Sequence, residues 1–425
     1  MPALCPCMNI PLFQNFSGYS TIKLLIKSFL IALLLSAFLF LEYFGIKSRL
    51  LLSLFGIFGF YLLINCKRLF WVGFFIGLFW FWWIGMSFRY YDLKVFVPIA
   101  IIFIALFYGV LFKIIESIAR IAAKIAPFLY HVILALALLV LSYIHPFGFN
   151  WFIPEIVFVD SYFGYDKLHF AFILTGLVLL SMKKILPALL GITLLLFALH
   201  SYPASPLAPL RIKLVTTHIP QDKKWKIEYL PTIIKQNFAA IDEAINEHYD
   251  VVVLPESAYP TFLQRNTALL LELLERSKKI TIITGALHLQ NSRVYNATYL
   301  FAKGNYTIMH KVVLVPFGEY VPLPKPLGKF VNHYFFNDAT DFTPAKNLQI
   351  YSVDGVEFTN AICYEATADV IYTTPTQYII AISNNAWFLP SYEPQLQNRI
   401  IKYYATIHHK TVYHATNIAQ TKVIR

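Results

Sequence analysis

The stretch VVVLPE, residues 251–256, predicts a short buried β-strand that runs directly into a carboxylate. Three successive valines favour an extended chain because β-branched side chains pack well on a pleated surface. Two later stretches also place a reactive side chain beside an apolar run: KVVLVPFGEYVP at residues 311–322 and NAICYE at residues 360–365. Layered α/β folds gather their chemistry just past the ends of strands. The three stretches therefore predict one reactive site in the second half of the chain.

The residues around these stretches alternate between strand patterns and helix patterns. Short β-branched runs predict strands at 211–217, 250–254, 279–285, 294–301, 306–314, 348–353, 358–363 and 378–383. Amphipathic spacing predicts helices at 226–247, 261–278 and 395–414. Strands mixed with helices indicate an α/β or α+β layered domain, which we place at residues 204–425.

The first half of the chain contains few charged residues. The chain has 425 residues, of which 58% are hydrophobic and 14% charged, against about 25% charged in soluble domains. Residues 1–200 hold 14 of the 35 Lys and Arg and 6 of the 23 Asp and Glu, which leaves 21 and 17 for residues 201–425. A helix needs about 20 apolar residues to cross a bilayer, and candidate spans are 22–44, 50–65, 69–87, 95–112, 129–144, 168–182 and 185–200. Residues 1–203 therefore predict a membrane domain with about seven transmembrane helices.

The net charge of +12 is a topology signal, because the basic surplus of the first half lies between apolar runs and not on a soluble face. Nucleic-acid binding is therefore not expected. If the N-terminus is cytoplasmic, nine basic residues flank the spans on the inside (Lys23, Lys27, Lys67, Arg68, Lys113, Arg120, Lys124, Lys183, Lys184) and five on the outside (Lys47, Arg49, Arg89, Lys94, Lys167). Basic residues favour the cytoplasmic side, so we expect residues 204–425 on the outer side. Losing or gaining one span would reverse that expectation.

Aromatic side chains crowd near the ends of spans, at residues 70–83 and 147–152. They predict an aromatic belt at the membrane interface, or alternatively an acyl-chain groove that faces the second half.

The three strand-end stretches supply a carboxylate, an ammonium and a thiol, at Glu256, Lys311 and Cys363. Each alone has an ordinary structural interpretation, as a helix cap, a surface charge or a core side chain. Together they supply a base, a cation and a nucleophile, as acyl transfer through a thiol requires. One cysteine and scattered histidines in this half give no zinc-ligand spacing, so we expect no metal.

The blocks LPES-AYP, KVVLVPFGEYVP, CYE and ISNNAWF, behind a multi-span membrane domain, closely resemble the bacterial apolipoprotein N-acyltransferase family, the membrane-anchored branch of the nitrilase superfamily. The blocks IPQDKKW, YNATY and PFGFNW extend the resemblance over most of the chain. It implies a nitrilase-like αββα domain at residues 204–425 and a Glu–Lys–Cys triad of Glu256, Lys311 and Cys363. It also implies location in the bacterial inner membrane, with the catalytic domain on the periplasmic side.

The implied activity moves a fatty acyl chain from a membrane phospholipid, through a thioester on Cys363, to the N-terminal α-amino group of diacylglyceryl-cysteine in apolipoproteins. No cofactor is implied. The resemblance assigns supporting or substrate-binding roles to five further residues: Glu319, Tyr364, Glu365, Trp225 and Trp387. The two glutamates are expected to orient the lysine or the base. The tryptophans are expected in a lipid-facing loop and in a pocket wall respectively.

The chain departs from the family pattern at several positions. Asn385 and Leu389 stand where the family usually has Asp and Gly, and its late Asn-x-Gly turn reads Asn-Ile-Ala at residues 417–419. Relatives are expected to continue beyond Arg425 with further strands and a final span, so the domain is expected to be short at its C-terminus, with that end on the outer side. Three functions stay open: the acyltransferase, a membrane-tethered amidase or nitrilase-type hydrolase in which water replaces the amine, and a non-catalytic lipoprotein-binding remnant.

Overall fold

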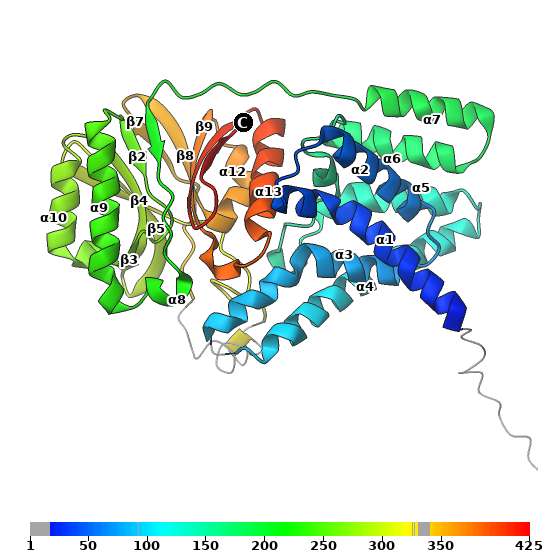
Figure 1. The fold of residues 1–425 in the computed structure, drawn as a ribbon, viewed down its shortest axis with the longest axis horizontal. Helices are drawn as coiled ribbons and strands as arrows, with labels where there is room; N and C mark the ends of the chain where they lie inside the picture. The colour runs from blue at the N-terminus through cyan, green and yellow to red at the C-terminus, as the bar shows by residue number, and fades with distance from the viewer. Residues whose placement is uncertain (1–17, 92, 325, 327, 330–340) are drawn as a thin grey trace, which may run out of the picture.

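The computed structural model describes residues 18–91, 93–324, 326, 328–329 and 341–425. Over that part of the chain, a helix lies at each of the seven predicted spans (Figure 1). These helices are α1 (Gly18–Tyr43), α2 (Arg49–Ile64), α3 (Phe70–Phe81), α4 (Phe96–Ala123), α5 (Leu129–Val140), α6 (Lys167–Ser181) and α7 (Ile185–Phe197). The segments Thr21–Tyr43, Phe70–Tyr90 and Phe96–Ala123 are long and apolar enough to cross a membrane, and the other four helices are shorter. The first half is therefore a helical, apolar membrane domain, as predicted.

The hairpin of α3 and α4 shows how these helices pack. A Cβ atom at Gly73 would lie 2.4 Å from the carbonyl oxygen of Tyr108, so only glycine allows the two backbones to approach this closely. Small residues at such contacts are typical of helices that associate in lipid. The opposite face of α4 exposes apolar side chains at helical spacing, including Ile99, Phe103 and Leu106. That face has the character of a surface that meets lipid.

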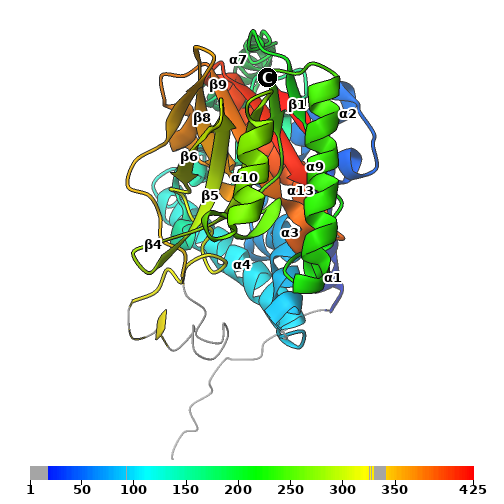
Figure 2. The same ribbon diagram turned by 90° about the vertical axis from the view of Figure 1, so that its left-hand side faces the viewer.

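The second half contains two stacked β-sheets, with helices on both outer faces (Figures 1 and 2). One sheet has the order β1-β2-β4-β5-β6, with β3 paired to β4, and the other has the order β11-β10-β9-β8-β7. The strands are β1 (Ile212–Leu214), β2 (Val251–Val253), β3 (Tyr259–Phe262), β4 (Thr281–Gln290), β5 (Arg293–Ala302), β6 (Asn305–His310), β7 (Ile350–Val353), β8 (Val356–Ile362), β9 (Tyr378–Asn384), β10 (Thr411–Asn417) and β11 (Lys422–Ile424). The helices are α8 (Gln221–Lys224), α9 (Leu230–Asn246), α10 (Thr267–Arg276), α12 (Asp369–Tyr372) and α13 (Glu393–Ile407). This αββα layering confirms the predicted fold class.

Apolar side chains from both sheets form the layer between them. Val251, Val253 and Ile283 of the first sheet belong to the same buried cluster as Phe358 and Ile380 of the second. Strands β8, β9 and β10 run parallel to one another. Their carboxyl ends therefore lie along one edge of the second sheet, and Cys363 follows the first of these ends.

One predicted helix is wrong in its second part. Residues 395–414 were expected to be a single helix, but α13 ends at Ile407 and β10 begins at Thr411, inside the second sheet. His409 has a φ of 54°, a left-handed conformation that an α-helix does not continue through. The run TVYHATN that follows is rich in β-branched and aromatic residues, which favour strands.

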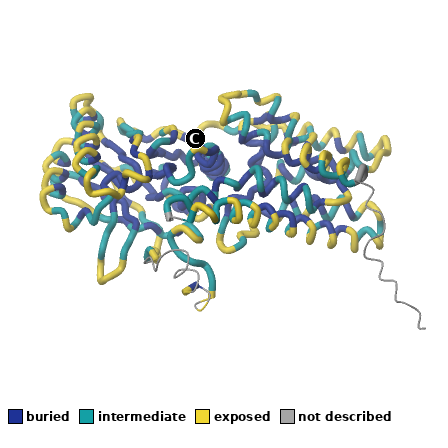
Figure 3. The backbone as a smooth tube through the Cα atoms, turned by 60° about the horizontal axis from the view of Figure 1, so that its bottom comes forward, coloured by how far each residue is buried: buried dark blue, intermediate teal, exposed yellow. Residues whose placement is uncertain are grey.

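The membrane half and the second half share one hydrophobic core. Buried residues of the membrane half, such as Phe158 and Phe170, belong to the same cluster as Ile371, Ile400 and Val412 of the second sheet and its helices. Figure 3 shows buried backbone continuing through the junction of the two halves. The site is therefore built on elements that are packed directly against the membrane domain.

Helix α13 is also held to the membrane half by polar contacts. Arg399 donates to the carbonyl oxygen of Val159 at 2.6 Å and forms an ion pair with Glu42 at 3.1 Å. The hydroxyl of Tyr403 donates to the buried carboxylate of Glu155 at 3.0 Å. One helix thus connects the second sheet to the membrane domain.

Candidate active site

Cys363 lies in a sharp turn between β8 and a 3-10 helix over Cys363–Thr367. Its φ of 55° is in the left-handed region, which is sparsely populated for residues other than glycine. Such strain costs on the order of 1–3 kcal/mol and is concentrated at functional sites. Burial raises the pKa of the thiol and the charge of Glu256 raises it further, whereas the ammonium of Lys311 lowers it. Formation of a thiolate at Cys363 therefore depends on the positive charge of Lys311.

Glu256 follows β2 and is buried. Its Oε1 accepts a hydrogen bond from Nδ2 of Asn296 at 2.7 Å, and its Oε2 accepts one from the backbone N–H of Asn384 at 2.8 Å. Gly285 of β4 lies under this turn, where a Cβ atom would come within 2.7 Å of the Glu256 Cα. The carboxylate is therefore fixed by both sheets, because Asn296 belongs to β5 and Asn384 to β9.

Lys311 directly follows β6, and its side chain is 1% exposed. Its Nζ lies 2.7 Å from Oε2 of Glu319, in the short turn that follows. Burial by itself lowers the pKa of this ammonium, but the charges of Glu319, Glu256 and Cys363 outweigh burial and raise it above the ordinary lysine value. Lys311 is therefore a permanent cation, close enough to both Glu256 and Cys363 to interact with their charges.

Glu319 contacts Lys311, Asn296 and the neighbouring backbone. Its Oε1 accepts from Nδ2 of Asn296 at 3.0 Å, and its Oε2 accepts from the backbone of Val315 at 2.8 Å. Asn296 thus donates to both Glu256 and Glu319 through one amide nitrogen. It lies in the YNATY block, but that block alone did not indicate a bridge between two carboxylates.

Glu365 makes its hydrogen bonds to the backbone, and the charge of Lys311 also lowers its pKa. Its Oε1 accepts from the N–H groups of Val312 and Val313 at 2.7 and 3.1 Å, and its Oε2 accepts from that of Ile362 at 2.9 Å. The carboxyl therefore joins the backbone just after Lys311 to the residue just before Cys363. Burial raises its pKa to about 7, although the three N–H groups lower it.

Tyr364 connects the nucleophile turn to the membrane half. Its hydroxyl donates to the carbonyl oxygen of Gly148 at 3.0 Å and accepts from the N–H of Asn150 at 3.0 Å. The indole N–H of Trp151 donates to the hydroxyl of Thr367 at 2.7 Å. The PFGFNW loop of the membrane half therefore holds the turn that carries Cys363.

The two tryptophans differ in exposure and in what they contact. Trp225 directly follows α8 and is 44% exposed. Trp387 packs edge-on against Tyr90 of the membrane half, with ring centroids 5.5 Å apart. The neighbouring Phe388 contacts Trp83 at 4.8 Å. The aromatic cluster of residues 80–90 thus packs against the catalytic half, a role that a simple interfacial belt does not describe.

A second polar group reaches the thiol from α13. Nε2 of Gln397 lies 3.9 Å from the Cys363 sulfur, and Nδ2 of Asn385 donates to both Gln397 Oε1 and Glu393 Oε2 at 2.9 Å. Asn385, at the position where the family is expected to have Asp, therefore links Gln397 to the buried carboxyl group of Glu393. Sequence reasoning missed Glu393 and Gln397, because their helical spacing is that of any core-facing helix.

We expect Glu393 to make stability depend on pH. Burial raises its pKa from 4.5 to about 8, so between these pH values the folded chain holds a proton that the unfolded chain releases. Stability should therefore fall as pH rises through this window. Between about pH 5 and about pH 8 the melting temperature of the unmodified chain should fall. The fall in the Glu393→Gln variant should be smaller by roughly 3 °C or more.

The measurement is thermal unfolding of the detergent-solubilised protein across that pH range. The control is Glu357→Gln, an exposed glutamate on β8. If the melting temperature of Glu393→Gln falls with pH as steeply as that of the unmodified chain, the prediction is contradicted.

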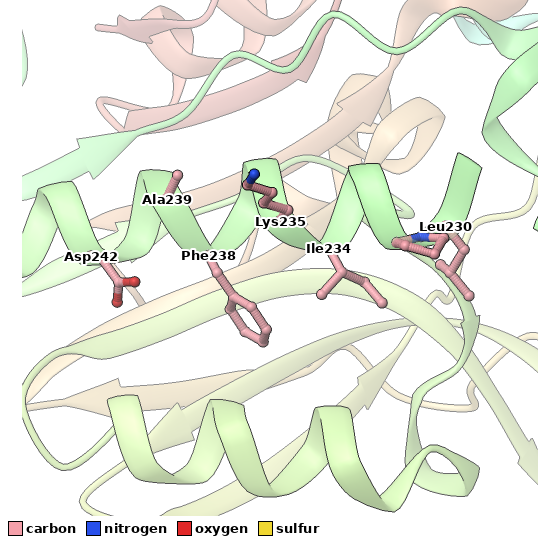
Figure 4. A pocket seen from close by; sticks show the side chains of 7 residues that line it. Leu230, Ile234, Lys235, Phe238, Ala239 and Asp242 are labelled. Carbon is pink, nitrogen blue, oxygen red and sulfur yellow. The ribbon is translucent and has the colours of Figure 1, made fainter. Parts of the chain in front are cut away.

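An open pocket elsewhere does not contribute to this site. It lies along α9 and is lined by Leu230, Pro231, Ile234, Lys235, Phe238, Ala239 and Asp242. Figure 4 shows Ile234 and Phe238 pointing from α9 toward α10, on the outer face of the first sheet. Within the described ranges no cluster of three or more His, Cys, Asp or Glu could hold a metal ion.

The αββα fold, with a thiol, a carboxylate and an ammonium at its strand ends, defines a domain of the carbon–nitrogen hydrolase, or nitrilase, class joined to a membrane domain. Residues 22–201 match the apolipoprotein N-acyltransferase integral membrane domain, and residues 224–423 match the carbon-nitrogen hydrolase family.

Comparison with known proteins identifies the family. The chain is 40% identical to the apolipoprotein N-acyltransferase of Wolinella succinogenes, over 92% of this chain and 94% of that protein. It is 37% identical to the apolipoprotein N-acyltransferase of Campylobacter jejuni, over 97% of this chain and 92% of that protein. A CN-hydrolase superfamily protein from Xanthomonas campestris is 14% identical, with a TM-score of 0.37, over 50% of this chain and 77% of that one. The chain belongs to the apolipoprotein N-acyltransferase family and is an acyltransferase.

Proposed function

We propose that this acyltransferase moves a fatty acyl chain from a membrane phospholipid, through a thioester on Cys363, to the α-amino group of diacylglyceryl-cysteine at the N-terminus of apolipoproteins. The observation that carries the proposal is the cluster of Cys363 with the buried Glu256 and Lys311, beside the membrane domain. Both substrates carry acyl chains, so a site packed against membrane helices suits them.

In the first half-reaction Glu256 takes the proton of the Cys363 thiol, and the sulfur attacks the ester carbonyl carbon of the phospholipid. Lys311 donates to the oxyanion of the tetrahedral intermediate, as preorganised donors do in acyl transfer. The carbon–oxygen ester bond then breaks. The leaving lysophospholipid alcohol takes its proton from Glu256, and the acyl chain stays on sulfur as a thioester.

In the second half-reaction the uncharged α-amino group of the lipoprotein attacks the thioester carbon. A carbon–nitrogen bond forms, the carbon–sulfur bond breaks, and the amine proton passes to Glu256 and then back to the thiolate. An ester is thereby exchanged for a more stable amide, so the reaction needs no nucleotide, metal or cofactor. Two successive half-reactions on one thiol give ping-pong kinetics.

The surrounding residues have supporting roles in this proposal. Glu319 holds the ammonium of Lys311, and Glu365 holds the backbone on either side of the site. Tyr364 ties the nucleophile turn to the membrane domain. Trp225 contributes to a lipid-facing loop, and Trp387 forms part of the pocket wall.

We also propose the location and the domain boundaries. Residues 1–203 are the membrane domain and residues 204–425 the catalytic domain, in the inner membrane of a bacterium. The N-terminus is cytoplasmic and the catalytic domain lies on the periplasmic side, which the distribution of basic residues between the spans supports.

The test is mass analysis of a diacyl lipopeptide mixed with phospholipid vesicles and the purified full-length chain. The expected product gains one acyl chain on the α-amine, while an equal amount of lysophospholipid appears. A lipopeptide with a blocked α-amine is the control and should not change. Release of free fatty acid without lipopeptide acylation would overturn the proposal in favour of a hydrolase, and lipopeptide binding without any acyl-enzyme would overturn it in favour of a binding protein.

A further inference from the structure

Lys224, the last residue of α8, is a buried cation that the proposed mechanism does not use. Its side chain is among the largest fully buried ones, with 0% of the residue exposed. Its Nζ donates to the main-chain carbonyl oxygen of Glu256 at 3.1 Å. A buried charge is costly unless opposite charge lies nearby. The partner in hydrogen-bond contact is a neutral carbonyl, so the compensating charge must come from the site itself.

That charge comes from the two groups that exchange a proton. Burial lowers the pKa of Lys224 to about 8, and the charges of Glu256 and Cys363 act in the opposite direction. At neutral pH the ammonium is therefore mostly charged. Because electrostatic interaction is mutual, the same ammonium stabilises negative charge on the Glu256 carboxylate and on the Cys363 sulfur.

Hydrogen bonds at both ends of α8 fix the position of Lys224. Helix α8 begins directly after Pro220, and its first residue, Gln221, accepts a hydrogen bond from Nδ2 of Asn384 at 2.9 Å. The N–H of Asn384 in turn donates to Oε2 of Glu256. Both ends of α8 are thus tied to Glu256, one through Asn384 and the other through Lys224.

The proton transfer explains why a second cation is useful. When Glu256 takes the thiol proton, one negative charge moves from the carboxylate to the sulfur and the total charge stays the same. Lys311 is already paired with Glu319 at 2.7 Å. Lys224 has no carboxylate in hydrogen-bond contact among the described residues, and its charge interacts with both ends of the transfer.

We propose that Lys224 is a positioning residue that fixes the Glu256 main chain and electrostatically stabilises the single negative charge shared by Glu256 and Cys363. This inference rests on the proposed roles of Glu256 as base and Cys363 as nucleophile.

The test compares two adjacent lysines. Lys224→Met removes the buried charge, Lys224→Arg keeps it, and Lys223→Met removes a neighbouring charge that lies on the exposed side of α8. The measurement is the rate at which iodoacetamide alkylates Cys363 in the full-length protein, followed by the mass of the Cys363 peptide across pH. The charged groups around the thiol in this profile are Glu256, Lys311, Glu319, Glu365, Glu393 and Lys224.

In the plot of Cys363 alkylation rate against pH, we expect the acid side of the Lys224→Met curve to shift to a pH about one unit higher. At a fixed pH on that side of the curve, alkylation of the variant is then about tenfold slower. Lys223→Met should stay within about twofold of the unmodified chain, and Lys224→Arg should stay closer to it than Lys224→Met does. Lys224→Met should unfold at the same or a higher temperature, because replacing a buried charge with an apolar side chain is often neutral or stabilising. A merely structural lysine would not show slower alkylation together with preserved stability.

An unshifted Lys224→Met profile would overturn the inference. An equal loss in Lys224→Arg and Lys224→Met, with both folded, would also overturn it, because shape and not charge would then be responsible. Failure of the proposed function is a separate result: the unmodified protein would alkylate normally at Cys363 but would form no acyl-enzyme with phospholipid.

Discussion

Replacing Cys363 with alanine or serine is expected to abolish the acyl-enzyme and to reduce lipopeptide acylation by at least about a thousandfold. The proposed mechanism routes both half-reactions through this sulfur, and a hydroxyl is a far weaker nucleophile than a thiolate. The measurement is the intact mass of the protein after incubation with phospholipid. The unmodified chain should carry one fatty-acyl adduct, and the two variants should carry none.

The matched control is Cys66→Ala in the membrane half, whose thiol is buried and donates to the carbonyl oxygen of Arg68 at 3.3 Å. It should acylate normally. Alanine at position 363 has the same backbone preferences as cysteine, so the fold should survive the change. Cys363→Gly should give an inactive protein whose free energy of unfolding is about 1 kcal/mol higher than that of the unmodified chain, because glycine adopts a φ of 55° without strain. An undiminished adduct on Cys363→Ala would refute the assignment of the nucleophile.

The division into a membrane half and a layered α/β half was predictable because it depends on short-range patterns, whereas the αββα order came from the family resemblance. Charge depletion marks the membrane half, and β-branched runs that end in a reactive side chain mark three strand ends. The structure places Glu256, Lys311 and Cys363 at such ends, with β6 stopping at His310 so that Lys311 leaves the sheet. The expected strand at 306–314 continued too far, because the valines that follow Lys311 resemble a strand but are bound by Glu365.

Pairings between distant segments were not predictable. Nothing local in the IPQDKKW block distinguishes Lys224 from Lys223, yet one is fully buried against Glu256 and the other lies on the surface. In the sequence, Asn385 indicates only that a carboxylate is missing. In the structure its Nδ2 donates to Oε2 of Glu393, on α13, at 2.9 Å. These contacts depend on three-dimensional packing across many residues, which periodicity and spacing do not encode.

The junction of the two halves holds the turn that carries Cys363 from two sides. The PFGFNW loop contacts Tyr364 and Thr367 on one side of Cys363, and α13 contacts the thiol through Gln397 on the other. Both elements are anchored in the membrane domain, the second through Arg399 and Glu42. The turn that carries Cys363 is therefore in direct contact with the membrane domain on one side and with α13 on the other.

Replacing Lys311 with methionine is expected to slow acyl-enzyme formation by a factor of about one hundred to one thousand, because the loss of one oxyanion donor costs about 3–4 kcal/mol of transition-state stabilisation. It should also destabilise the fold, since Glu319 would stay buried without its cation. Breaking a buried pair in this way costs on the order of 3–5 kcal/mol. The measurements are single-turnover acylation by phospholipid and thermal unfolding of the same samples.

The double variant Lys311→Met/Glu319→Gln separates these two effects. Removing the unpaired carboxylate should restore most of the lost stability, but the acylation rate should stay low because the donor to the oxyanion is still absent. Lys303→Met is the control and should change neither measurement, because Lys303 is 82% exposed and lies in the turn between β5 and β6. If the double variant recovers its rate together with its stability, Lys311 acts only as the partner of Glu319. A rate that stays low in a stable protein would mean that the ammonium acts in the chemical step itself.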